Sequence, residues 1–186
     1  MKKLGFLQVL GILLVLVSLA VCILWQRAGQ ENDALTQKLL AVLPQESPGT
    51  PDAYADARMP ILQMDGEDYV ALLEVPIMGV TLPVKDLWQP QRLNGGPCRF
   101  WGSIYDGSAI IGGSWRQFEF CSRLEPGDTI RLRDMQGTVF TCQVKTIQRW
   151  KEADYARLAE GNYPLTLFVR ERISNRYIMV RCEWAY

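Results

Sequence analysis

The sequence predicts an all-β domain, a closed β-barrel with short helices, preceded by an N-terminal transmembrane helix. Three observations predict this architecture. Residues 4–25 contain no charged side chain. From about residue 65 onward, short apolar or alternating runs are separated by turn residues, a pattern typical of β-strands. Those roughly 120 residues suit one compact domain, and closing its strands into a barrel removes exposed strand edges.

The N-terminal run, LGFLQVLGILLVLVSLAVCILW (residues 4–25), has only Gln8 and Ser18 as clearly polar side chains. As a helix it would rise about 33 Å at about 1.5 Å per residue, enough to cross the hydrocarbon core. Lys2 and Lys3 precede it, so the positive-inside rule places the N-terminus in the cytoplasm and the rest outside. The alternative is a cleaved signal peptide, whose apolar region is shorter and ends in a small-residue site. We predict an uncleaved single-pass anchor over residues 1–25.

Residues 26–64 are predicted to form a stalk. Asn32 or Asp33 can cap a short helix that Pro44 ends. The apolar residues of this helix recur at near-helical spacing. They are Leu35, Leu39, Leu40, Val42 and Leu43. Residues 45–60 hold three prolines and small residues without a period, which predicts a loose linker.

The domain, residues 65–186, is predicted from short apolar or alternating runs that are separated by turn residues. Residues 69–84 form two strands with a turn near Gly79. Residues 128–134 and 137–150 form a hairpin through Met135, Gln136 and Gly137. The other predicted elements are a buried strand at 109–113, a short helix or turn at 153–161, a buried strand at 165–169 and a last strand at 176–184.

The stretch SAIIGGSWRQF (residues 108–118) is the most unusual part of the domain. Gly112 and Gly113 remove side chains where the strand ends, and Ser114 follows them. Glycines at a strand end usually mean that a backbone or a ligand comes close. The sequence therefore predicts cleared space beside Ser114.

Composition excludes several kinds of function. Twenty basic and twenty acidic residues cancel, so no overall field attracts nucleic acid. The chain has no histidine, which removes Ser-His and Cys-His nucleophile pairs and the commonest metal ligand. The cysteines, at positions 22, 98, 121, 142 and 182, show no CxxC spacing. We therefore predict no metal and no cofactor.

Several stretches, in this order, resemble a sortase, the cell-wall cysteine transpeptidase of Gram-positive bacteria. YVALLEVPIMGVTLPV (69–84) is similar to the first strands of the family, which end in Leu-Pro-Val. AIIGGS (109–114) resembles the strand that ends in Ala-Gly-His, and FCSRLEPGDTIRL (120–132) the helix and L-x-x-G-D-x-I turn after it. LTLFVR (165–170) resembles the Thr-Leu-x-Thr-Cys strand, and RYIMVRC (176–182) the arginine-led last strand. The resemblance covers about residues 67–184.

In sortases a cysteine thiolate attacks a peptide carbonyl, a histidine handles protons, and an arginine steadies the substrate or the oxyanion. Position by position, the histidine falls on Ser114, the cysteine on Arg170 and the arginine on Arg176, so only the last position matches. The resemblance thus implies a sortase-like barrel that has lost its catalytic pair. The space before Ser114 would be the space that accommodated the catalytic histidine of the family. Only residues 171–175 separate Arg170 from Arg176, a shorter loop than the family usually has.

The resulting prediction is an inactive, membrane-anchored sortase-like protein outside the cytoplasmic membrane, with a peptide-binding or scaffolding role at the cell surface. Its partner would be a surface-protein peptide or a ligand similar to a sorting signal. Arg116, Arg170 and Arg176 are the candidate binding residues, because arginine binds carboxylate or phosphate through paired donors. The alternative is that these arginines are solvated and matched to carboxylates. Those carboxylates would be Glu119, Glu171 and Glu183.

Two hypotheses of an enzymatic function remain as alternatives, together with a purely structural role. An active sortase-type enzyme could use non-standard residues such as Cys121, with nearby Arg116 lowering the pKa of its thiol. A serine-lysine hydrolase could use Ser114 with Lys145 or Lys151.

The redox state of the cysteines is also open. The four cysteines beyond the anchor allow three full disulfide pairings. We favour 98–121 with 142–182, against the alternative that all four are free core residues.

Overall fold

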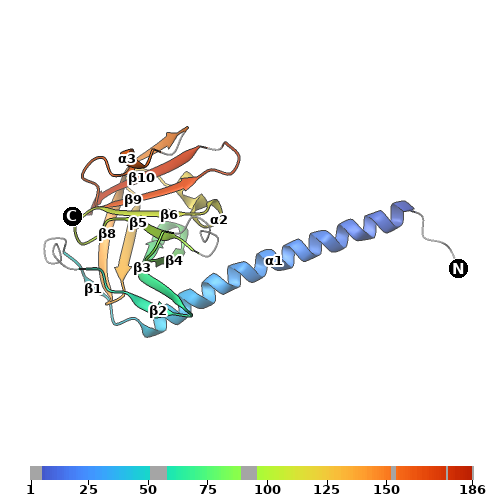
Figure 1. The fold of residues 1–186 in the computed structure, drawn as a ribbon, viewed down its shortest axis with the longest axis horizontal. Coiled ribbons are helices and arrows are strands. Elements are labelled where there is room, and N and C mark those ends of the chain that lie inside the picture. The colour runs from blue at the N-terminus through green and yellow to red at the C-terminus, as the bar shows by residue number, and fades with distance from the viewer. Residues whose placement is uncertain (1–5, 51–57, 89–95, 152–153, 175, 186) are drawn as a thin grey trace.

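The computed structural model describes residues 6–50, 58–88, 96–151, 154–174 and 176–185. They form a β-barrel at one end of a long helix, α1, which extends far beyond it (Figure 1). The strands are β1 (Ser47–Pro48), β2 (Leu62–Met64), β3 (Glu67–Val75), β4 (Val80–Lys85), β5 (Cys98–Trp101), β6 (Ala109–Gly113), β7 (Thr129–Asp134), β8 (Thr138–Trp150), β9 (Leu165–Arg170) and β10 (Tyr177–Trp184). The helices are α1 (Phe6–Val42), η2 (Pro76–Met78), α2 (Trp115–Phe118), η4 (Glu119–Ser122) and α3 (Tyr155–Leu158).

Eight of the described strands close into a barrel. The order around it is β3, β4, β5, β6, β9, β10, β8 and β7, and β7 pairs with β3 to complete the ring. β6 runs parallel to β9, and β10 is antiparallel to both β9 and β8. Closure leaves only β1 and β2 as additions, on β8 and β3 respectively. The predicted mostly-β barrel is confirmed.

Most of the predicted strands are present near their predicted bounds. The hairpin through Met135, Gln136 and Gly137 is confirmed, and a buried carboxylate organises it. Asp134 Oδ1 accepts hydrogen bonds from the backbone N–H groups of Gln136 and Thr138, both at 2.8 Å. Its Oδ2 accepts a 2.6 Å hydrogen bond from the hydroxyl of Tyr105. β1, β2 and β5 were not predicted, because each has only two to four residues and no clear period.

The side chains that point into the barrel form one apolar core, to which every barrel strand except β5 contributes. Its largest fully buried side chains include Phe118, Phe120 and Phe140. Phe118 and Phe120 come from α2 and η4, which therefore close one end of the barrel. A second cluster, on the outer face of β6, β9 and β10, contains Ile110, Phe168 and Met179.

The predicted short helix beginning at Asn32 or Asp33 is wrong as an independent element. Residues up to Val42 belong to one continuous helix of 37 residues, so no cap lies at position 32 or 33. No proline precedes Pro44 to interrupt the helix, and its last turns are held by packing. Leu39 and Leu43 are buried against a cluster on β3 and the β7–β8 hairpin.

The predicted transmembrane helix finds no support in the structure. Within the described residues, no helix combines the length and the apolar composition that a membrane span requires. Residues 4 and 5 of the predicted span lie outside the described residues.

The part of the predicted linker that is described is fixed to the barrel. Ser47 N–H donates to the carbonyl of Gly137 at 3.0 Å, and Gly49 N–H donates to that of Val139 at 2.9 Å. The carboxylate of Glu46 pairs with Arg133, at 3.1 Å, and with Arg131. Residues 45–50 therefore lie along the barrel, with Ser47–Pro48 as the added strand β1, rather than forming a loose linker. Residues 51–57 lie outside the described part of the chain.

Candidate functional site

The three positions predicted from sequence meet at one end of three adjacent strands. In the parallel pair of β6 and β9, Gly113 lies opposite Val169, so Ser114 and Arg170 follow side by side. In the antiparallel pair of β9 and β10, Arg170 lies opposite Tyr177, and Arg176 immediately precedes that residue. The N–H of Glu171 donates a 2.7 Å hydrogen bond to the carbonyl of Arg176 and closes the turn. We call this group, Ser114, Arg170 and Arg176, the strand-end site.

The space around the two glycines is filled by aromatic rings. A Cβ atom on Gly112 would lie 2.4 Å from Cζ3 of Trp88 and 2.5 Å from Cζ of Phe168. A Cβ atom on Gly113 would lie 2.9 Å from Cδ1 of Phe118. The prediction that this space is open beside Ser114 is therefore wrong, since both faces of the strand end carry a ring of the chain itself.

Trp88 belongs to an aromatic group on the outer face of the barrel. Its ring centroid lies 5.2 Å from that of Phe100, edge-on, and 5.2 Å from that of Phe168. Phe100 and Phe168 are also edge-on, at 5.5 Å. This group was not predicted, because Trp88 and Phe100 lie in stretches without a regular apolar period and contact Phe168 only through the fold.

Ser114 is half-buried at the start of α2. Its hydroxyl donates a 2.9 Å hydrogen bond to Oε1 of Gln117, and its carbonyl accepts from the N–H groups of Gln117 and Phe118, both at 3.0 Å. Gln117, which sequence analysis also missed, thus orients this serine. A glutamine amide is no general base, so these contacts alone do not activate the hydroxyl.

The two lysines considered as partners of Ser114 lie elsewhere. Lys145 pairs with Glu183 at 2.6 Å, and this hydrogen bond raises the pKa of its ammonium group. Lys151 follows the end of β8, and β10 and β9 separate β8 from β6. The structure does not bring a serine-lysine pair together at Ser114.

The cysteines of the barrel are free and buried, so the favoured disulfide pairing is wrong. Register explains why one of the two bridges does not form: Cys142 lies opposite Trp184, and Cys182 opposite Val144. Burial raises the pKa of the Cys142 thiol to about 12 and that of the Cys182 thiol well above its ordinary value.

Cys121 does not have the reactive thiol that one enzyme reading requires. It is fully buried in η4, and burial raises the pKa of its thiol strongly. The prediction that Arg116 activates Cys121 is wrong, because desolvation outweighs any nearby charge. Among the described residues, no three cysteine, aspartate or glutamate side chains are placed to hold a metal ion.

Arg170 and Arg176 are exposed, and within the described chain no carboxylate pairs with either guanidinium. Glu171, one of the predicted partners, instead forms an ion pair with Arg149, whose Nε lies 3.6 Å from Oε1 of Glu171. The carboxylate of Glu171 also accepts a hydrogen bond from the hydroxyl of Ser174. Glu183 is paired with Lys145. The strand-end site therefore carries two positive charges that are available to a ligand.

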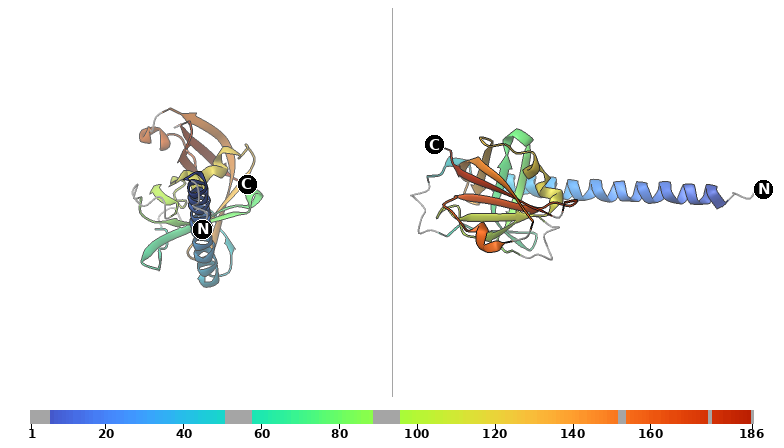
Figure 2. Two further views of the ribbon diagram at one scale, coloured as in Figure 1. Left: turned by 90° about the vertical axis from the view of Figure 1, so that its right-hand side faces the viewer. Right: turned by 90° about the horizontal axis from the view of Figure 1, so that it is seen from above.

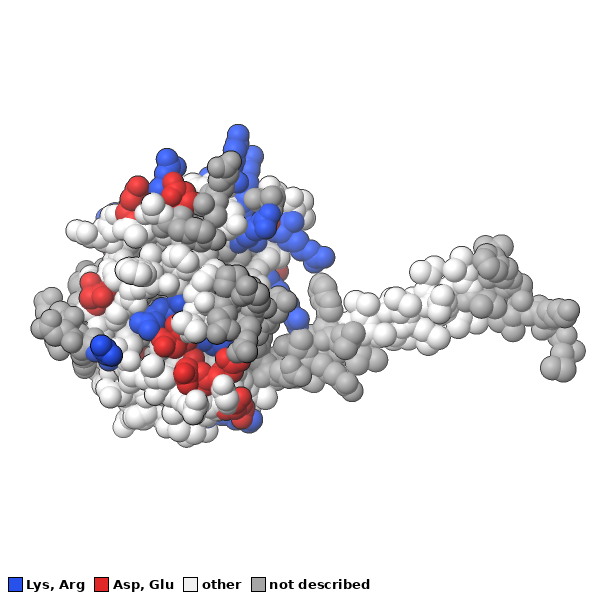
Figure 3. All heavy atoms as spheres, in the orientation of Figure 1, with Lys and Arg blue, Asp and Glu red and all other residues white. Residues whose placement is uncertain are grey.

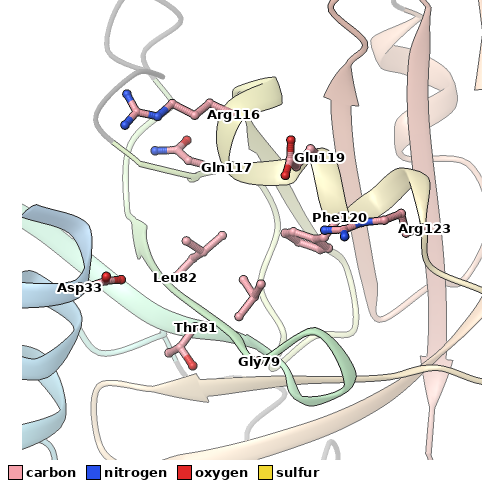
Figure 4. Close-up of a pocket in the computed structure, with 10 residues that line it drawn as sticks. Asp33, Gly79, Thr81, Leu82, Arg116, Gln117, Glu119, Phe120 and Arg123 are labelled. Carbon is pink, nitrogen blue, oxygen red and sulfur yellow. The ribbon is translucent and has the colours of Figure 1, made fainter. Parts of the chain in front are cut away.

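A cavity of about 300 Å³ lies between α1, β4 and the α2–η4 segment, next to the strand-end site (Figure 4). Arg116, Gln117, Glu119, Phe120 and Arg123 line one side of it. Asp33 of α1 and residues 79–82 line the other. Gln117 connects the cavity to the strand-end site, because it lines the cavity and accepts the hydrogen bond from the hydroxyl of Ser114. The lining carries charges of both signs.

Comparisons with solved structures identify this architecture. The chain is similar to sortase C-3 from Streptococcus pneumoniae, with 17% identity over 87% of this chain and 83% of that one and a TM-score of 0.57. It is also similar to sortase A from Corynebacterium diphtheriae (16% identity, 87% and 82% covered, TM-score 0.55). A third match is sortase C1 from Streptococcus agalactiae (20% identity, 72% and 74% covered, TM-score 0.57). No family model matches the sequence, and no curated protein matches it.

Proposed function

We propose, from the premise that this chain has the sortase fold, that it binds a peptide at the strand-end site and does not turn it over. One observation carries the proposal. The end of β9, where the resemblance places a catalytic cysteine, presents the exposed guanidinium of Arg170 beside Ser114. A guanidinium attracts anions and cannot act as a nucleophile.

The reaction of a cysteine transpeptidase needs a thiolate and a group that moves protons. The chain has no histidine. The described thiols are buried, and burial raises the pKa of three of them. Loss of such paired groups costs several orders of magnitude in rate, so we expect no transfer and no cleavage.

The ligand class follows from the charges at the site. Arg170 is the last residue of β9 and Arg176 immediately precedes β10, and each can donate two parallel hydrogen bonds to a carboxylate. We therefore propose an extended peptide with an acidic side chain or a terminal carboxylate as the ligand.

We further propose that the barrel is held outside the cytoplasmic membrane by an anchor in residues 1–25. This part rests on the charge-free run at 4–25 and the two lysines before it. A protease-protection test on intact cells should place residues 30–186 outside, with the anchor retained. A mature protein that begins near residue 23 would contradict the anchor.

Peptide titration tests the binding proposal. Isothermal calorimetry should show binding of an extended acidic peptide, weaker binding in high salt, and no binding of its neutral analogue. Arg170→Ala should weaken binding about tenfold, because a paired carboxylate contact is lost. Lys145→Ala is the matched control, since it also removes one positive charge and its ammonium already pairs with Glu183.

Two results would overturn the proposed function. Equal affinity for acidic and neutral peptides would leave Arg170 without a role in recognition. Measurable peptide cleavage or transfer that disappears in Ser114→Ala would show a working enzyme at the strand-end site.

A further inference from the structure

The turn between β9 and β10 ends in a fully exposed apolar residue. Ile173 is 99% exposed, and its neighbours Arg172 and Ser174 are exposed as well. A single exposed isoleucine is common on protein surfaces. Here the isoleucine lies at the tip of a projecting turn, next to the basic residue Arg172. A partner of this tip must contact an apolar side chain and a positive charge together.

The surroundings of this tip are basic. The exposed arginines on the turn and on the α2–η4 segment are Arg116, Arg123, Arg170, Arg172 and Arg176. Acidic residues at the same end include Glu119 and Glu171, and Glu171 is already paired with Arg149. In the space-filling view, Lys and Arg side chains gather at the upper right of the barrel (Figure 3). Positive charge therefore dominates this end.

This end of the barrel faces the same way as the N-terminal half of α1. In Figure 1 the β9–β10 turn and α2 lie on the side of the barrel from which α1 extends. The view from above shows the same arrangement (Figure 2). That half of α1 exposes leucine, isoleucine and valine side chains between residues 10 and 21. An apolar helix and a basic rim with an apolar tip thus point in one direction.

We propose that the β9–β10 tip, Arg172 and Ile173 with the arginines beside it, docks onto an anionic phospholipid surface. Arginines near such a surface are attracted to the lipid phosphates, while an apolar side chain enters the boundary between headgroups and acyl chains. A convex tip suits a broad surface better than it suits a folded partner, which would need a matching pocket. The inference goes beyond peptide binding and requires only an anionic surface on this side of the barrel.

A fluorescent reporter beside the tip tests this inference. Full-length protein is labelled with an environment-sensitive fluorophore on Ser174→Cys, in a Cys22→Ser background, because the cysteines of the barrel are buried. The control label is on Gln136→Cys, which lies on the hairpin at the far end of β8. Each protein is reconstituted into vesicles of phosphatidylcholine with or without phosphatidylglycerol.

The emission maximum of the tip label should shift to shorter wavelengths in vesicles that contain phosphatidylglycerol, and it should not shift in vesicles of phosphatidylcholine alone. The shift should disappear near 1 M salt, where the screening length falls to about 3 Å. Arg172→Ala should weaken the contact about fivefold and Ile173→Ser about tenfold. Lys38→Ala, whose ammonium pairs with Asp65 on another part of the molecule, should leave it unchanged. The control label should stay in water throughout.

Two outcomes would overturn the inference. A tip label that stays in water in both vesicles shows that the tip does not meet the bilayer. A label shielded equally in both, and insensitive to salt, shows that anionic lipid is not recognised. Arg172→Ala and Ile173→Ser should leave the peptide titration unchanged, so failure here is distinct from failure of peptide binding.

Discussion

Gly112→Ala should destabilise the barrel, because the space beside this glycine is occupied. The new Cβ would lie 2.4 Å from Trp88 and 2.5 Å from Phe168, about 1 Å inside ordinary van der Waals contact. Overpacking of this kind costs about 1–3 kcal/mol. Replacing glycine by alanine restricts the unfolded chain and returns about 0.4–1 kcal/mol. We expect a net loss of about 1–2 kcal/mol in the free energy of unfolding.

Urea unfolding followed by circular dichroism measures this loss, and the melting temperature should fall by about 2–8 °C for a chain of this size. The control is the same change in a Trp88→Ala background, where one of the two clashes is absent and the penalty should fall by about half. If the glycine instead clears room for a ligand, alanine will leave the unfolding free energy unchanged or raise it. That result would refute the reasoning.

Further predictions concern the core and the strand-end site. The buried cysteines should resist thiol reagents until the chain unfolds, and the labelled mass should be the same with and without reductant. Because burial raises the pKa of the Cys142 thiol to about 12, the contribution of this thiol to stability should be constant well below the ordinary thiol pKa, where it stays protonated in both the folded and the unfolded chain. Above pH 9 it should fall by about 1.4 kcal/mol per pH unit for each such thiol, which urea titrations across that range would detect. Tyr105→Phe should cost about 1–3 kcal/mol in the same assay, since it leaves one oxygen of the buried Asp134 carboxylate without its hydroxyl donor. Ser114→His combined with Arg170→Cys should still give no transfer in a peptide assay, because catalysis needs all three groups in a productive geometry and the short loop of residues 171–175 does not hold Arg176 in that geometry.

Much of the barrel could be predicted, because its long strands are alternating or continuously apolar runs bounded by turn residues. In β7 and much of β8 the apolar side chains recur at about every second position, whereas β3 and β10 contain continuous apolar runs. β5 was missed since it has four residues and pairs briefly with its neighbours. The continuity of α1 was missed because Asp33, a common helix cap, stands in mid-helix before the anchoring Leu39.

The location of the strand-end site could be predicted, but the side chains that surround it could not. The resemblance to sortases predicted that Ser114, Arg170 and Arg176 lie together, and strand register agrees. The rings that fill the glycine space could not be predicted, since Trp88 lies 24 positions before Gly112 and touches it only after the barrel closes. Glycine indicates a close approach and does not identify what approaches.

The fold of this barrel and its proposed binding site depend on different residues. The barrel depends on buried side chains within the paired strands, such as Leu167 and Val180, where a wrong residue costs several kcal/mol. The proposed binding depends on Arg170 and Arg176, which are exposed at the ends of strands. Substitution there changes stability little. Arg170→Cys should therefore unfold at the same urea concentration as the parent, and a loss above about 1 kcal/mol would mean that the guanidinium supports the fold.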